Sequence, residues 1–497
     1  MAGTRQIRYR LMVDWDFNGT YTDESAYLLN AEGDMRLSPV NSGMVSGSGI
    51  VSSATFTLRN ASGRFSPLRT DGALYTYIRD GKSYHAPCYF EVSINGGTNY
   101  SRVFTGVLKL PQETTLTTLE TPTVRFDARS VEEQYLQQRV SLTQAQMAAI
   151  YDDGATEADI ISTYLQLAGV AVGDMTFDAG LLVIPWAWMD DESAIEECWA
   201  LAAACGGRFF ADPDGKFVYH NMAHWQTATR STAVQYSFTR DTLANFSLRL
   251  DDSDLYNAVT VEASPRTIGA QDVIWEPDAP PVIAPGETKK LTARYDAPTY
   301  SIWGIQHSAY DQGGNDRTSS VTITATYYAQ RADLVIVNAS TLQVLVKPLR
   351  ILGVPVIGGP ENEERRTSAD DGANGAWWTD RGERSLAVRG NPYIQTAAHA
   401  GTLAQFLLDR CEYPRLTAAI NAPGQPGLRL GDRIQVTDAI TATAAFTGYV
   451  TGVRWSYGFG AFQQAIEAIS TTGMYAYDGS YFIVGAHAAN GTARLFY

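Results

Sequence analysis

Two histidines give this sequence its nearest approach to a metal site. His220 and His224 lie four residues apart, a spacing that places two side chains on one face of a helix, where they could bind zinc. Residues 217–219 just before them read Phe-Val-Tyr, which is typical of a strand, so we expect packing or surface histidines. The acidic run at 251–254 offers the carboxylates that calcium binds, but it lacks the glycine and the terminal glutamate of a calcium loop. We expect a solvated turn there and predict no metal site.

The signatures of the common enzyme classes are missing from the sequence. It contains no phosphate-cradling Walker loop, no His-Glu-x-x-His zinc motif and no Gly-x-Ser-x-Gly nucleophile turn. Gly458 and Gly460 form a glycine pair in an expected hairpin, without the third glycine and the helix of a dinucleotide site. Six histidines leave few candidates for acid–base chemistry near neutral pH. We therefore predict no enzyme activity, no catalytic residue and no cofactor.

One enzymatic alternative stays open at this point. Paired carboxylates for glycoside hydrolysis come together only in the fold, and exposed tryptophans can stack on sugar rings. The sequence has two close pairs of tryptophans, namely Trp186 with Trp188 and Trp377 with Trp378. Large aromatic side chains more often anchor a core or an interface, and this is the interpretation that we favour.

The overall charge indicates which partners the protein avoids. Among 497 residues, 38 are basic and 53 are acidic, which gives a formal net charge of −15. Such a molecule repels phosphate and is a poor nucleic-acid clamp, although an acidic wall would let DNA pass without sticking. No apolar run approaches the roughly 20 residues that a membrane helix needs. The first six residues lead directly into an alternating strand without the apolar region of a signal peptide, so we expect synthesis in the cytoplasm.

Cysteine usage agrees with a reducing compartment. Cys88 and Cys411 lie far apart in the sequence. Cys198 and Cys205 are expected on one helix, where seven residues place their Cα atoms about 10 Å apart, beyond disulfide reach. We expect four buried, free thiols.

The first 130 residues are predicted to be almost entirely β-structure. Apolar and polar residues alternate over 7–17, the period of a half-buried strand. A hairpin is expected from 89–94 through Asn-Gly-Gly at 95–97 to 100–108, and a further strand over 123–128. Short turns between antiparallel strands favour a barrel or a sandwich.

The period then becomes helical between 131 and 235. Thr156 to Asp159 is typical of a helix start, and a second helix over about 191–205 is expected to stop at Gly206-Gly207. The Phe-rich strands that follow, at 208–211 and 216–219, flank an Asp-Pro-Asp-Gly turn and predict a hairpin.

Strand patterns return after residue 236. We predict an inserted β-sandwich over 266–379, in which 359–375 forms an exposed acidic loop, and a helix over about 396–411. The last expected strands are 448–457 and 462–469. The aromatic and glycine-rich tail after 472 lies outside this pattern.

The most specific segment of the chain is 58–67, Leu-Arg-Asn-Ala-Ser-Gly-Arg-Phe-Ser-Pro. It closes the alternating strand 53–58 through a turn that predicts a positive φ near Gly63. Arg64 can satisfy an acidic partner or several carbonyls at once, so we assign it a structural role. With the strand ending at 15–21 about fifty residues earlier, this segment resembles the minor tail proteins of long-tailed, siphovirus-like bacteriophages, which are associated with the baseplate hub.

Three later motifs are similar to the same family and follow in its order. They are the helix, Gly-Gly and hairpin over 191–219, the strand 255–261, and Leu-Gly-Asp-Arg-Ile-Gln-Val at 430–436 with the closing hairpin. The resemblance implies a mainly β, multi-domain fold with a smaller α/β part and two barrels like those of the tail tube. The implied domains are a hub barrel at 1–130, a helix-hairpin domain at 131–235, a second barrel at 236–265 and 380–472, the sandwich at 266–379 and a tail at 473–497.

The resemblance also implies a function. A virion structural protein of the tail tip would form a trimeric baseplate hub ring that adapts the six-fold tail tube to the tip and lets tape-measure protein and DNA pass. Expected partners are further copies of the chain, distal tail and tube proteins, tape-measure protein and tip fibres or receptor-binding proteins, with transient DNA contact and no membrane insertion. The alternatives are a peripheral receptor-binding or carbohydrate-binding tail protein and a tail-associated hydrolase of cell walls or polysaccharides.

Overall fold

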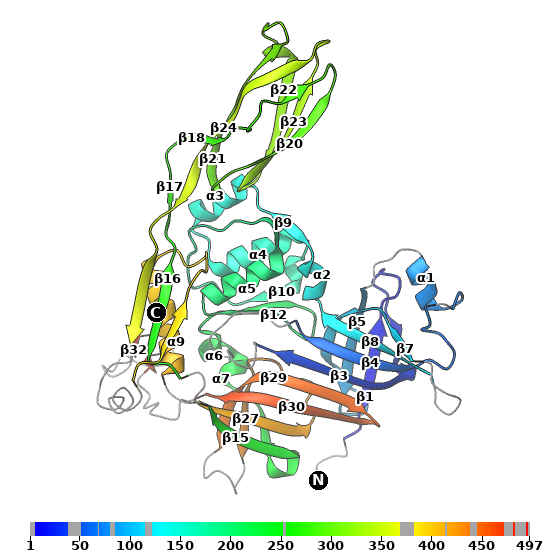
Figure 1. Ribbon diagram of the computed structural model, residues 1–497. Coiled ribbons are helices and arrows are strands. Elements are labelled where there is room, and N and C mark those ends of the chain that lie inside the picture. Colours follow the sequence, from blue (N-terminus) through cyan, green and yellow to red (C-terminus); the bar gives the residue numbers. More distant parts are fainter. Residues whose placement is uncertain are drawn as a thin grey trace.

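One large sheet combines strands from both ends of the chain and forms the lower part of the molecule (Figure 1). The computed structural model describes residues 5–37, 51–67, 69–79, 85–114, 122–251, 255–367, 382–412, 415–437, 445–471, 481–482 and 494–495. The N-terminal half of the sheet contains β1 (Arg8–Val13), β2 (Thr22–Asp23), β3 (Leu28–Arg36), β4 (Ser53–Arg59), β5 (Ala86–Ser93), β6 (Ser101–Leu108), β7 (Gln112–Thr114) and β8 (Thr123–Ser130). The C-terminal half contains β14 (Val234–Thr239), β15 (Asn245–Asp251), β27 (Arg415–Pro423), β28 (Arg433–Thr437), β29 (Phe446–Gly458) and β30 (Ala461–Ser470).

The strand order of this sheet is open. It runs β15-β27-β30-β29-β3-β4-β8-β6-β5-β1-β2, with β28 beside β29, β14 beside β28, and β7 beside β8. The chain is mainly β, as predicted, but among the described strands neither half closes into a separate barrel. The reason is the pairing of β3 with β29, from Arg36 opposite Gly452 to Asn30 opposite Gly458, which joins one half to the other along these strands.

Trp455 on β29 links the hydrophobic cores of the two halves. Its buried ring stacks on Phe90 of β5 with the ring centroids 5.2 Å apart. Gly33 on the neighbouring β3 leaves the space for the indole, because a Cβ atom there would lie 2.4 Å from it. The two halves therefore share side chains as well as backbone hydrogen bonds.

The first strand is shorter than the alternation predicted. β1 ends at Val13 because the carboxylate of Asp14 accepts hydrogen bonds from the backbone N–H groups of Asp16 (3.2 Å), Asn18 (3.3 Å) and Gly19 (2.8 Å). These bonds fold the chain into a turn, because the three backbone N–H groups donate to the Asp14 side chain and not to a neighbouring strand.

Helices form the middle of the molecule, above the large sheet (Figure 1). They are α2 (Glu132–Leu136), α3 (Gln144–Asp153), α4 (Glu157–Leu167) and α5 (Ala194–Ala204). The short helices α6 (His224–Thr227) and α7 (Thr229–Thr232) lie lower, next to β29, and α1 (Ala73–Arg79) lies apart in the N-terminal half. Small sheets join β10 (Met175–Phe177), β12 (Arg208–Ala211) and β13 (Phe217–His220), and join β9 (Arg139–Ser141) with β11 (Asp190–Ser193). α4 begins as predicted, since Asp159 accepts the backbone N–H of Thr156 at 3.0 Å.

The strand after residue 255 does not join the large sheet, which corrects the predicted second barrel. β16 (Ala258–Ala263) pairs with β25 (Asn362–Thr367) and β26 (Ser385–Val388), beside α9 (Ala397–Cys411). Val259 and Val261 are fully buried in one core with residues of α4, α5 and α9. Burying these apolar side chains against the helices stabilises β16 at this place, outside the large sheet. The predicted loop 359–375 is also wrong over Asn362–Thr367, which forms β25, and its remainder from 368 lies outside the described residues.

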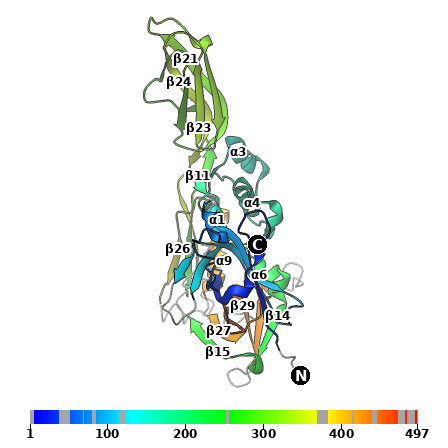
Figure 2. The ribbon, with the colours of Figure 1, turned by 90° about the vertical axis from the view of Figure 1, so that its right-hand side faces the viewer.

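The inserted region extends upward as a narrow body of two sheets (Figures 1 and 2). One contains β17 (Arg266–Ile268), β18 (Asp272–Trp275), β19 (Val282–Ile283), β21 (Thr299–Asp311) and β24 (Val344–Gly358), and the other contains β20 (Thr288–Arg294), β22 (Val321–Tyr327) and β23 (Arg331–Asn338). Asp190 of the helical part forms ion pairs with Arg331 and Arg294 at its base. In the tail, β31 (Tyr481–Phe482) pairs with β32 (Arg494–Leu495).

Two expectations about the whole chain can be compared with the structure. All four cysteines are buried and form no disulfide bond, as predicted. Within the described ranges, no helix is both long enough and apolar enough to span a membrane.

Candidate functional site: a junction of three chain segments

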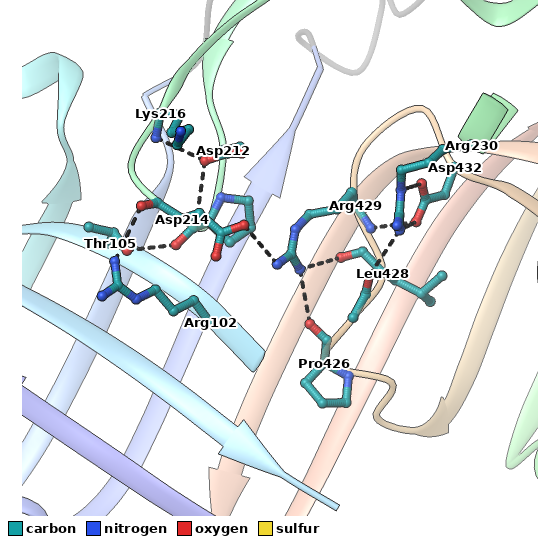
Figure 3. Close-up of polar contacts among 12 residues, drawn as sticks. Arg102, Thr105, Asp212, Asp214, Lys216, Arg230, Pro426, Leu428, Arg429 and Asp432 are labelled. Atoms are coloured by element: carbon teal, nitrogen blue, oxygen red, sulfur yellow. Dashed lines mark hydrogen bonds and ion pairs between the residues drawn. The ribbon is translucent and has the colours of Figure 1, made fainter. Parts of the chain in front are cut away.

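The turn of the β12–β13 hairpin lies where the helical part meets both halves of the large sheet (Figure 3). Asp212 shapes this turn, because its carboxylate accepts the backbone N–H groups of Asp214 and Lys216, each at 2.9 Å. Burial raises the pKa of the Asp212 carboxyl group. The turn is therefore a fixed structure that can carry contacts on its outer side.

The hairpin turn contacts β6 in the N-terminal half of the sheet. Thr105 donates its hydroxyl to the carbonyl of Pro213 at 2.6 Å, and Arg102 donates to the carbonyl of Asp214 at 3.3 Å. Both acceptors are backbone carbonyls, so these bonds depend on the path of the turn more than on its side chains.

On its other side the same turn contacts the loop before β28 in the C-terminal half. Arg429 pairs with the Asp214 carboxylate at 3.2 Å and also donates to the carbonyls of Pro426 (3.0 Å) and Leu428 (3.3 Å). Its backbone N–H donates to the Asp432 carboxylate at 2.8 Å. Arg429 thus fixes its own loop and holds the hairpin with one side chain.

A bidentate ion pair completes this arrangement. Arg230 of α7 donates to both carboxylate oxygens of Asp432, with the Nε contact at 2.6 Å, and Asp432 is 1% exposed. Arg230 also donates to the carbonyl of Gly427 at 3.0 Å, and the hydrogen bond to Asp432 raises the pKa of its guanidinium. We call Arg102, Thr105, Asp212, Asp214, Arg230, Arg429 and Asp432 the three-segment junction.

Below the hairpin, Glu132 at the start of α2 supports the same position. It is fully buried and its Oε1 accepts the backbone N–H of Ala211 at 2.7 Å. Burial raises the pKa of its carboxyl group. A buried acid thus connects the N-terminal part of the chain to the hairpin.

Arg64, the residue that the sequence singled out, has an acidic partner. It donates to Glu24 at 2.6 and 3.1 Å, and the Glu24 side chain is completely buried. Trp15 donates its indole N–H to the same carboxylate at 2.9 Å. Gly63 has a φ of 67°, so the predicted positive φ is confirmed, as is the structural role of Arg64.

The two histidines do come together, in a different way from a helical pair. His220 ends β13 and His224 begins α6, and their rings stack with centroids 3.3 Å apart. His224 contacts Asp178 through Nδ1 at 2.7 Å. Among the described residues no group of three or more His, Cys, Asp or Glu side chains is arranged to hold a metal ion.

The tryptophans differ in their surroundings. Trp186 is buried and stacks on Tyr151 with centroids 4.1 Å apart, so its ring offers no open face to a sugar. Trp188 is half-buried, with the Arg266 guanidinium 4.3 Å from its ring centroid. Trp377 and Trp378 lie outside the described residues, as do residues 252–254 of the acidic run.

Sequence reasoning missed the junction because its residues lie far apart in the sequence, in β6, in the helical part between 212 and 230, and in the loop before β28. The Asp-Pro-Asp-Gly turn and the Leu-Gly-Asp-Arg motif are both visible in the sequence, but as separate local patterns. A signal that could have connected the two turns is that each carries a charged residue of opposite sign with no local role evident from the sequence, Asp214 in one and Arg429 in the other. The junction contains no nucleophile and no set of metal ligands. Its hydrogen bonds and ion pairs connect the helical part to the two halves of the sheet.

Comparison with solved structures gives near full-length similarities. The tail protein from Neisseria meningitidis MC58 has a TM-score of 0.49 and 10% identity, covering 93% of this chain and 97% of that one. The 43 kDa tail protein of prophage MuSo2 from Shewanella oneidensis has a TM-score of 0.47 and 11% identity, covering 93% and 98%.

A third similar structure comes from a secretion system. The E. coli c3393 protein is described as a type VI secretion component with structural similarity to T4 tail proteins gp27 and gp5. It has a TM-score of 0.39 and 9% identity, covering 95% of this chain and 78% of that one. No protein-family model and no curated protein matches the sequence.

Proposed function

We propose that this chain is a structural subunit of a bacteriophage tail tip, and that it forms a trimeric baseplate hub ring. The ring would adapt the six-fold tail tube to the tip and leave a passage for tape-measure protein and DNA. Its neighbours would be distal tail and tube proteins on one side and fibres or receptor-binding proteins on the other. The ordered motifs from 15–21 to 430–436 support this assignment.

The observation that carries the proposal is the large sheet. Strands from the two ends of the chain form two halves, joined through β3 and β29 and sharing a core at Trp455. Two β-halves in each subunit would give six similar surfaces in a ring of three, which is what a six-fold tube requires. Each half would correspond to one tube-like unit, at 1–130 and within the C-terminal part of the chain.

The three-segment junction supports a structural role in which the parts of the subunit are held together. A hub subunit must keep its parts in one orientation while the tube above it is attached and the contents pass. Arg429 and Thr105 hold the hairpin turn to opposite halves of the sheet, and Arg230 with Asp432 fixes the loop that carries Arg429. A net charge of −15 agrees with a passage to which DNA does not adhere.

The test combines mass with location. Native mass spectrometry of the purified full-length chain should give three times the subunit mass of 54.2 kDa, alone or with its tube neighbour. Electron microscopy of the particle should place the chain on the tail axis. A monomer found at the periphery of the tip would falsify the ring, and release of sugar ends or peptides from host cell walls would replace it with the hydrolase.

One observation favours the peripheral receptor-binding alternative. Trp303 on β21 of the inserted region is 67% exposed, and Val273 on β18 is also exposed. Exposed apolar side chains on a projecting body are typical of interaction sites. Binding of the full-length chain to host cells, lost in Trp303→Ala and kept in Phe459→Ala at the exposed β29–β30 turn, would support this second role.

A further inference from the structure

Two buried arginines lie over one indole ring at the base of the helical part. Arg208 on β12 is 4% exposed and Arg410 on α9 is 9% exposed. The guanidinium carbons lie 4.2 Å and 5.2 Å from the ring centroid of Trp225 on α6. Tyr449 of β29 stacks on the same indole, with centroids 4.7 Å apart. Cation–π contact stabilises both guanidinium groups but leaves their positive charge uncancelled.

The described side chains supply almost no acceptor for these two groups. Arg410 donates to the backbone carbonyl of Met222 at 3.4 Å, and within the described ranges neither arginine has a carboxylate partner. Asp178, which contacts His224 next to Trp225, is engaged by that histidine at 2.7 Å and by the backbone N–H of Asn221 at 3.0 Å. Two like charges are therefore buried side by side without a counter-charge, which is strongly unfavourable.

The electrostatics of the pair agree with this geometry. Burial lowers the pKa of Arg208 to about 10, and the charge of Arg415 adds to the effect. Burial lowers the pKa of Arg410 well below its usual range, and the charge of Arg208 is the next cause. A guanidinium does not give up its proton near neutral pH, so both charges persist in the folded chain.

Two further nitrogen atoms beside the pair show the same shortage of acceptors. Trp225 Nε1 and His220 Nδ1 are buried and have no hydrogen-bond partner among the described residues. They lie close together, since a Cβ atom on Gly431 would be 3.4 Å from the first and 3.7 Å from the second. Burial lowers the pKa of His220 well below its usual range, so its ring is neutral and can carry its proton on Nδ1.

We propose that Arg208 and Arg410 bind a small oxyanion of the phosphate or sulfate class, with the indole N–H of Trp225 as an additional donor at the edge of the site. Guanidinium groups match the planar pairs of oxygens that such anions present, and the anion would cancel the buried charge. The same chemistry could come from a carboxylate of a neighbouring subunit. The near-complete burial of both arginines favours a free ion, which needs no exposed surface to dock.

The test measures phosphate-dependent stability of the purified full-length chain. The midpoint of thermal unfolding, Tm, is followed from 0 to about 20 mM inorganic phosphate, with potassium chloride keeping the ionic strength constant. An anion bound to the folded state raises Tm with a saturating dependence on its concentration. We expect this rise in the wild type and in the control Arg389→Met, whose side chain is 61% exposed and pairs with Glu363. We expect its loss in Arg208→Met and in Arg410→Met.

The sign of the Arg208→Met effect separates the alternatives. If no anion is bound, replacing an unpaired buried cation by an apolar side chain raises Tm equally at every phosphate concentration, which overturns the proposal. If a subunit carboxylate fills the site, phosphate leaves Tm unchanged while Arg208→Met abolishes assembly, which also overturns the free ion. Should Arg208→Met fail to fold, Arg208→Lys and crystals soaked in selenate provide the readout. An anomalous peak between the two guanidinium groups supports the site, and its absence overturns it.

Discussion

Arg429 and Asp214 form an ion pair at 3.2 Å that connects the C-terminal loop to the hairpin turn of the helical part. The Arg429 side chain is 21% exposed and that of Asp214 is 45% exposed, so the two partners differ in what their loss would cost. Arg429 also satisfies two carbonyls of its own loop, whereas the backbone of Asp214 is held independently by Arg102.

We therefore predict unequal effects of removing the two partners. Arg429→Ala should lower the free energy of unfolding by about 1–3 kcal/mol, because it leaves partly buried carbonyls without donors. Asp214→Asn should cost less, about 0–1 kcal/mol, as for an exposed ion pair. Urea unfolding of both variants and of the double variant measures the coupling. Arg454→Ala, at a 64% exposed arginine of β29, is the control, and an equal loss there would show that the junction has no special role.

Gly63 provides a prediction that depends on the backbone. With φ at 67°, valine would be strained, and its Cβ would also lie 3.2 Å from the Arg69 side chain. Gly63→Val should cost about 1–3 kcal/mol and reduce the yield of folded protein. Gly63→Asn serves as the matched control, since asparagine tolerates this conformation. A valine variant as stable as the asparagine variant would contradict the strain argument, and the free energy of unfolding decides between them.

The sequence predicted features that depend on neighbouring residues. The positive φ at Gly63, the helix start at Thr156 and the hairpin after Gly207 all follow from local rules of turns and caps, and all were confirmed. The structural role of Arg64 was also correct, but its partner Glu24 lies 40 residues away. No local pattern indicates which of the 53 acidic residues an arginine will meet.

The predictions that failed depended on long-range pairing. The alternation of β16 is the same whether its apolar face packs in a barrel or against helices, so sequence alone assigned it to the wrong sheet. The pairing of β3 with β29 joins segments more than 400 residues apart. Among the described residues Arg208 has no carboxylate partner, and no local sequence pattern indicates such a buried, unpaired charge.

The Glu24–Arg64 pair should be sensitive to the removal of one partner. Arg64→Met leaves the Glu24 carboxylate buried, with the Trp15 N–H as its one side-chain donor among the described residues, so we expect a loss of about 3–5 kcal/mol in unfolding free energy. Adding Glu24→Gln removes the unpaired charge and should recover part of this loss. Denaturant unfolding of the single and double variants measures both effects. A double variant less stable than Arg64→Met would show that the charge is not the cause.

Glu132 gives a prediction about pH. Burial raises the pKa of its carboxyl group above the ordinary value of 4.5 in the folded chain, so the folded state holds its proton more tightly than the unfolded state. Below pH 4.5 the group is protonated in both states and its full contribution to stability is present. As pH rises from 4.5 through the folded pKa, the unfolded state loses its proton first, and this contribution declines.

The variant Glu132→Gln isolates this contribution because glutamine is neutral at every pH and keeps an oxygen for the Ala211 N–H. We expect the wild type to lose unfolding free energy relative to the variant as pH rises from 4 to 8. Urea unfolding at five pH values gives this difference directly. Glu133→Gln is the neighbouring control, since Glu133 pairs with Lys109 and its side chain is 21% exposed. If the wild type gained stability over Glu132→Gln with rising pH, the carboxylate would have to be charged in the fold. A hydrogen-bond donor would then compensate the burial of the charged Glu132 carboxylate, and an ionic contact would hold the β12–β13 hairpin.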